Sequence, residues 1–182
     1  MKKLIVICIS AVLASSLWLA AQETRREVVH SSATDTQPNN DRVPDVYAIT
    51  GQVQRIVVLR FKYNTDLLAG LAKMVKQEKI RNAVILSAIG SVRNYQVHEV
   101  GNREFPIKDV FVKNPATPAD ILGMSGFVIN GRLHPHITLA SPDRAFGGHL
   151  EPDTTVFTFA IVTLAVLDDD LDLAKIDDST YR

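Results

Sequence analysis

The dipeptide Asn130-Gly131 lies between two extended apolar stretches and constrains the fold of this chain more than any other feature. Residues 121–129 precede it and residues 133–140 follow it, and both are rich in residues that favour strands. Asn-Gly is the preferred pair for a two-residue type I′ turn, because both central positions of that turn need a positive φ. The sequence therefore predicts a β-hairpin whose second strand carries two histidines.

Other segments predict the elements around this hairpin. Four have the composition of strands, namely residues 53–60, 83–89, 92–100 and 154–167. After Asp66, apolar residues recur at helical spacing and predict one helix between the first two of these strands. Residues 101–118 are rich in turn formers and predict a loop with at most a short strand. Together these segments predict a single α/β domain.

The N-terminal residues predict where the chain goes. Lys2 and Lys3 precede an uncharged apolar run up to Ala21, which is a signal-peptide pattern, so we expect export to the periplasm or outside the cell. The run is also near the length that spans a bilayer, so residues 1–21 could instead be an uncleaved membrane anchor.

The rest of the chain divides into three regions by composition. Residues 22–50 are polar without a sustained period and predict a flexible linker, in which His30 would be solvated. Residues 51–168 predict the folded domain, and residues 169–182 predict a solvated acidic tail.

Cysteine content and charge exclude several kinds of site. The one cysteine, Cys8, lies in the leader, so the mature chain would have no disulfide, thiolate ligand or Cys nucleophile. The whole chain has a formal net charge of +0, and removal of Lys2 and Lys3 leaves 18 basic and 20 acidic residues, a net charge of −2. This balance lacks the basic excess of a nucleic-acid-binding protein.

Three histidines form the strongest candidate site. His134 and His136 are two residues apart on a predicted strand, so their side chains should project from the same face. His149 follows two glycines, which would allow a tight turn or a close backbone approach. Three imidazoles without a thiolate suit an open site for zinc, nickel, copper or iron. We expect a divalent transition metal here, with zinc as the first candidate; the alternative is surface or hydrogen-bonding histidines.

Small residues complete the predicted ligand-binding set. This set comprises Ser87, Gly90, Ser91, Gly147 and Gly148. The first three lie at the end of a predicted strand, where a backbone turn could bind an anion or simply pack.

No residue stands out as a general base for catalysis. Asp143 and Glu151 are near the histidines only in chain order, and His98 is expected at the surface. Whether the protein is an enzyme is therefore left open.

Several segments, in their order, resemble the PPC (plants-and-prokaryotes-conserved) domain. They are residues 56–60 (IVVLR), the helix after Asp66, residues 83–91 (AVILSAIGS), Gly126, residues 134–136 (HPH), residues 147–150 (GGHL) and residues 160–164. The resemblance implies an α+β fold with a mainly antiparallel mixed β-sheet, flanking helices and assembly as a homotrimer. It also implies the histidine metal site of many prokaryotic members, which maps to His134, His136 and His149.

Prokaryotic members are often labelled DNA-binding proteins, and plant members carry AT-hooks. This chain has no such hook, has no basic excess and carries an export signal, so we do not expect nucleic acid as a partner. Many prokaryotic relatives have Glu after the final-strand alanine, whereas Ile161 follows Ala160 here. We therefore expect an exported, trimeric, three-histidine metal-binding module for a small or anionic ligand, in contact with a membrane only through an uncleaved leader. The alternatives are a DNA-binding protein and a metal-dependent hydrolase or lyase.

Overall fold

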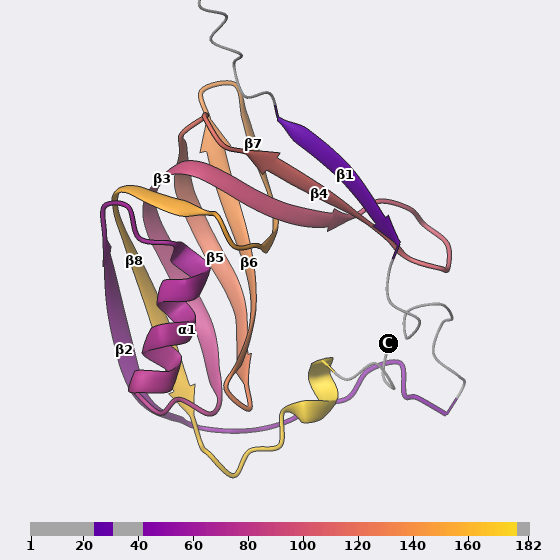
Figure 1. Ribbon diagram of the computed structural model, residues 1–182. Helices are drawn as coiled ribbons and strands as arrows, with labels where there is room; N and C mark the ends of the chain where they lie inside the picture. Colours follow the sequence, from indigo (N-terminus) through magenta and orange to yellow (C-terminus); the bar gives the residue numbers. More distant parts are fainter. Residues whose placement is uncertain (1–23, 31–41, 178–182) are drawn as a thin grey trace, which may run out of the picture.

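The computed structural model describes residues 24–30 and 42–177, and most of this part is β-sheet (Figure 1). The elements in chain order are β1 (Arg25–His30), β2 (Val53–Lys62), α1 (Leu67–Gln77), β3 (Ala83–Val100), β4 (Lys108–Asn114), β5 (Ala119–Ile129), β6 (Arg132–Ser141), β7 (Arg144–Leu150), β8 (Thr155–Leu167) and the 3-10 helix η1 (Ala174–Asp177). Within these described ranges, no helix has the length and apolarity needed to cross a membrane.

The sheet is antiparallel at every pairing between the named strands. The expectation of a mainly antiparallel sheet is therefore confirmed, although no pairing between the named strands is parallel as a mixed sheet would require. Flanking helices were expected, whereas α1 is the one α-helix in the described part of the chain. The physical reason lies in the connections: β5 to β6 and β6 to β7 are joined by very short turns, whereas a parallel pair needs a long crossover.

The hairpin of β5 and β6 is confirmed. Asn130 and Gly131 have φ values of 50° and 79°, as the predicted turn requires. Ile129 pairs with Arg132 across this turn, and the register continues along both strands to Asp120 and Ala140.

The 18-residue strand β3 organises the sheet. Its first half pairs with β5 and β8, and its second half pairs with β4 and, at Val97 and His98, with β7. We predicted two strands separated near Gly90, but the chain continues through that glycine, whose φ is 135° and whose register shifts on both sides. Glycine tolerates this conformation, and β3 keeps β5 and β8 as neighbours before and after it. The pairing with β4 begins farther along the strand, at Tyr95.

The helix α1 covers one face of the sheet (Figure 1). Asp66 caps it by accepting a hydrogen bond from the Ala69 N–H at 2.7 Å, and Leu67, Leu71 and Val75 are buried. Strand β2 alternates on the two faces of the sheet: Leu59 is buried in the core, whereas Val58 is 64% exposed. The face away from α1 is thus open and partly apolar.

Two segments outside the expected domain also fold. Strand β1, which lies in the predicted linker, pairs with β4, so residues 25–30 are not a structureless spacer. In the tail, Leu173 is buried, and the buried amide of Asn82 donates to the carbonyls of Asp168 and Leu171 at 3.2 and 2.8 Å. This satisfied amide ties the start of the acidic segment to the domain. The predicted leader lies outside the described residues.

Gly147 of β7 tests how tightly β7 packs on β6. A Cβ added there would lie 2.1 Å from the carbonyl oxygen of Ile137, whereas a Cβ at Gly123 of β5 would meet nothing within 4 Å. Gly147→Ala should therefore lower the free energy of unfolding by about 1–3 kcal/mol, and the control Gly123→Ala should change it by less than about 1 kcal/mol. Urea denaturation of the two variants measures both, and equal effects would contradict this packing.

Candidate metal centre

A row of histidines crosses three neighbouring strands. His136 of β6 pairs with His149 of β7, and His149 pairs with His98 of β3. Paired residues on adjacent strands project from the same face, so the three side chains lie side by side. His134 is two residues before His136 and shares this face. The sheet therefore brings four imidazoles together from segments that are far apart in sequence.

The three predicted ligands form a nearly equilateral group. The ring centres of His134 and His136 are 5.3 Å apart, and His149 lies 5.1 Å from the first and 5.5 Å from the second. The Nε2 atoms of His134 and His136 are 3.3 Å apart. Ile137, on the opposite face of β6, is buried and anchors the strand in the core, whereas His136 is exposed.

These distances fit the spacing that one metal ion imposes. A tetrahedral zinc ion about 2.0–2.1 Å from each imidazole nitrogen separates two ligand nitrogens by about 3.3 Å and their ring centres by roughly 5 Å. A neutral hydrogen bond between two nitrogens is ordinarily shorter than 3.3 Å. The donor set, imidazoles with a nearby carboxylate and no thiolate, also suits such an ion. The residues present therefore fit the group that the resemblance implies.

The sequence analysis missed two members of the cluster, His98 and Glu151. The expectation that His98 lies at the surface was wrong, because its side chain is 25% exposed and its Nδ1 lies 2.6 Å from Oε1 of Glu151. The same carboxylate oxygen lies 3.2 Å from Nδ1 of His149, and the rings of His98 and His149 stack at 4.6 Å. A local sequence pattern cannot reveal this group, because the contact of β3 with β7 pairs residues that are far apart in the sequence.

His98, His149 and Glu151 could themselves hold a metal, since one ligand atom of each lies within 4.8 Å of the others. His149 thus belongs to two candidate groups. Because its Nδ1 faces Glu151, Nε2 is the ring nitrogen left for an ion shared with His134 and His136. A carboxylate on the second nitrogen of a ligating histidine is the usual way to fix its tautomer and orientation. If the ion lies among the three histidines, Glu151 and His98 would support that group.

The histidines also affect one another's protonation. Burial lowers the pKa of His136 below its ordinary value of 6.5, and the neighbouring His134 and His98 lower it further. Burial likewise lowers the pKa of His149, with His98 acting in the same direction and Glu151 opposing it. Burial and the neighbouring histidines thus both favour the neutral imidazole, which is the form that binds a metal.

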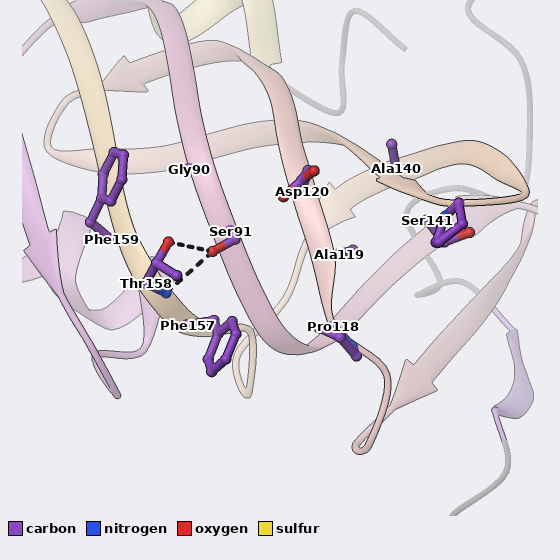
Figure 2. Close-up of a pocket in the computed structure, with 11 residues that line it drawn as sticks. Gly90, Ser91, Pro118, Ala119, Asp120, Ala140, Ser141, Phe157, Thr158 and Phe159 are labelled. Carbon is purple, nitrogen blue, oxygen red and sulfur yellow. Dashed lines mark hydrogen bonds between the residues drawn. The ribbon is translucent and has the colours of Figure 1, made fainter.

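The other predicted ligand-binding residues lie elsewhere, except Gly147 and Gly148 beside His149. Gly90 and Ser91 line a hollow of about 600 Å³ together with Asp120 and two phenylalanines (Figure 2), and none of the histidines lines it. Ser91 pairs with the hydroxyl of Thr158 at 2.7 Å and accepts from its N–H at 3.2 Å, so its polar atoms serve packing between β3 and β8. Ser87 is exposed on β3 and does not line that hollow.

Comparison with known proteins gives the family context. A family model described as the Plants and Prokaryotes Conserved (PCC) domain matches residues 48–168. A metal-containing protein from Archaeoglobus fulgidus is similar in structure, with a TM-score of 0.56 and 25% identity over 69% of this chain and 89% of that one. A plant- and prokaryote-conserved protein from Pyrococcus horikoshii has a TM-score of 0.54 and 20% identity over 68% and 85% of the two chains, which shows the shared fold.

One curated relative is the bifunctional protein GlmU of a Synechococcus species. It is 28% identical over 112 residues, which are 61% of this chain but 17% of that protein. The chain therefore corresponds to a small part of this relative.

The lowered pKa values predict a pH dependence for the metal-free protein. The unfolded chain, with histidines near 6.5, takes up protons before the folded one does, so the free energy of unfolding should fall as the pH falls through 6.5. Well above pH 6.5, these two histidines should cause no pH dependence of the free energy of unfolding. His136→Gln should flatten this dependence between pH about 7.5 and 5.5, a window above the ordinary range of Asp and Glu. Urea denaturation in the presence of a chelator measures the free energy of unfolding at each pH. An equal pH dependence in His136→Gln and the parent would contradict the lowered pKa of His136.

Proposed function

The chain belongs to the Plants and Prokaryotes Conserved (PCC) domain family, and from that premise we propose that it is a metal-binding module in which His134, His136 and His149 hold one divalent transition metal. The observation that carries the proposal is the near-equal spacing of the three rings, 5.1 to 5.5 Å. Zinc is the first candidate, because it accepts three imidazoles and leaves a fourth position open. The metal content of the similar Archaeoglobus fulgidus protein supports the same conclusion.

A bound ion would supply positive charge for a ligand. Three neutral imidazoles do not neutralise a divalent cation, so the open position favours a small anion. Glu151 contacts Nδ1 of His149 and of His98, so it would orient the ring of His149 as a ligand. The chain's own residues thus hold the ion, orient one ligand and leave a side accessible.

Binding is favoured over hydrolase or lyase activity by the contacts of Glu151. Glu151 is the carboxylate in the described histidine cluster. Its Oε1 already faces two imidazole nitrogens, Nδ1 of His98 and Nδ1 of His149. That arrangement suits an orienting carboxylate better than a base that accepts a proton from a substrate. DNA binding is disfavoured by the formal net charge of +0.

Assembly and export complete the proposal. The sheet face away from α1 exposes Ile56, Val58, Leu86 and Ile89, each more than half exposed, and an apolar surface of this kind supports burial between copies in a homotrimer. The charged-then-apolar leader supports export to the periplasm or beyond, with membrane anchoring as the alternative.

Elemental analysis of the purified chain tests the metal site. The parent should carry near-stoichiometric transition metal, and His134→Ala, His136→Ala and His149→Ala should each lose it while circular dichroism shows an intact fold. His98→Ala should keep the metal with affinity about 10–100-fold weaker, as expected for a supporting residue.

The pattern of variants separates the two candidate groups. If His98, His149 and Glu151 were the ligands, His98→Ala would lose the metal and His134→Ala would keep it. A parent that takes up no transition metal under saturating conditions would refute both.

A further inference from the structure

A hollow of about 520 Å³ opens beside two of the proposed ligands, His134 and His136. Its walls come from β3, β5, β6 and the C-terminal segment. This volume is within the range of small-molecule binding sites. It is separate from the hollow around Gly90 and Ser91, since the two share no lining residue.

The lining combines imidazoles with apolar side chains. Val84, Phe127 and Ile176 contribute apolar surface, and the described residues that line the hollow include no Lys, Arg, Asp or Glu. Phe127 is cross-strand partner to His134, so the apolar wall begins directly beside the metal ligands. A ligand body buried here would find no side chain to neutralise a charge, and an unpaired charge would be costly to desolvate.

The C-terminal segment that supplies Ile176 is fixed to the domain. Leu173 is buried, the hydroxyl of Tyr47 donates to the carbonyl of Lys175 at 2.6 Å, and the N–H of Ile176 donates to the carbonyl of Leu173 at 3.1 Å. In Figure 1 this segment, η1, lies beside the lower end of β6. The family match ends at residue 168, so this wall is an addition beyond the matched domain.

We infer that the hollow binds the apolar body of a small monocarboxylate whose carboxylate group is held at the metal. The inference rests on the proposed three-histidine site, whose ion would supply positive charge at a hollow where no described lining residue is Lys or Arg. The apolar walls select the body, and because no described lining residue carries a second charge, these walls disfavour dicarboxylates of similar length. Ile176 sets this selectivity without contributing to metal binding.

Titration calorimetry on the metal-loaded full chain tests the inference with three probes: acetate, octanoate and octanedioate. A fully buried methylene strengthens binding by up to about fourfold, so octanoate should bind at least about tenfold more tightly than acetate. Octanedioate carries a second carboxylate at the end that would lie in the apolar hollow. It should therefore lose the gain in affinity that octanoate shows over acetate. The metal-free chain should bind none of them measurably.

Matched variants locate the effect. Ile176→Asp should weaken octanoate at least about tenfold and leave acetate affinity and metal content unchanged, and Phe127→Ala should weaken octanoate from the opposite wall. Leu122→Asp is the control, because Leu122 is also an exposed apolar residue, at 57% against 39% for Ile176, but does not line the hollow.

The outcomes distinguish this inference from the proposed function. Metal uptake with equal affinity for acetate and octanoate would overturn the inference and leave the metal module standing. A second result would also overturn the inference: Ile176→Asp and Phe127→Ala change the oligomeric state but not octanoate affinity. That result would mean that a second copy of the chain covers the hollow. No metal uptake would refute the proposed function, and the inference with it.

Discussion

The arrangement of the site depends on how closely β7 approaches its two neighbours. A side chain at Gly147 would collide with the carbonyl of Ile137 on β6, and one at Gly148 would lie 2.4 Å from the carbonyl of His98 on β3. Two successive glycines therefore let one short strand pair on both edges. Because β7 lies between β6 and β3, His149 lies between His136 and His98. The histidine cluster is thus a consequence of backbone packing at two residues that bear no side chain.

Much of this was accessible from the sequence, for physical reasons that differ by residue. Asn130-Gly131 fixes its own turn, and the two-residue spacing of His134 and His136 fixes their common face, because both signals are local. The sequence also offered close approach as one role for Gly147 and Gly148. The contribution of His98 and Glu151 could not be found in this way, because it requires the pairing of strands about 50 residues apart. The same holds for the tail, whose attachment depends on the buried amide of Asn82.

The two faces of the sheet have different roles. The face under α1 carries the core, with Leu67, Leu71 and Val75 packed against it. The other face carries the histidines, with an apolar hollow at one end of the row and Glu151 at the other. A ligand approaching the histidines would therefore meet apolar walls on one side and a carboxylate, already occupied by two imidazoles, on the other. The proposal that a monocarboxylate binds here, with its carboxylate at the metal and its apolar body in the hollow, rests on this asymmetry.

The central claim is that three imidazoles share one ion. X-ray absorption spectroscopy at the metal edge of the zinc-loaded chain tests it most directly, because it reports the atoms bound to the ion. The account predicts three nitrogen ligands at about 2.0–2.1 Å with the multiple-scattering pattern of imidazole and no sulfur, unchanged in His98→Ala. A shell of oxygens with one imidazole or none, or an imidazole contribution that falls in His98→Ala, would contradict it.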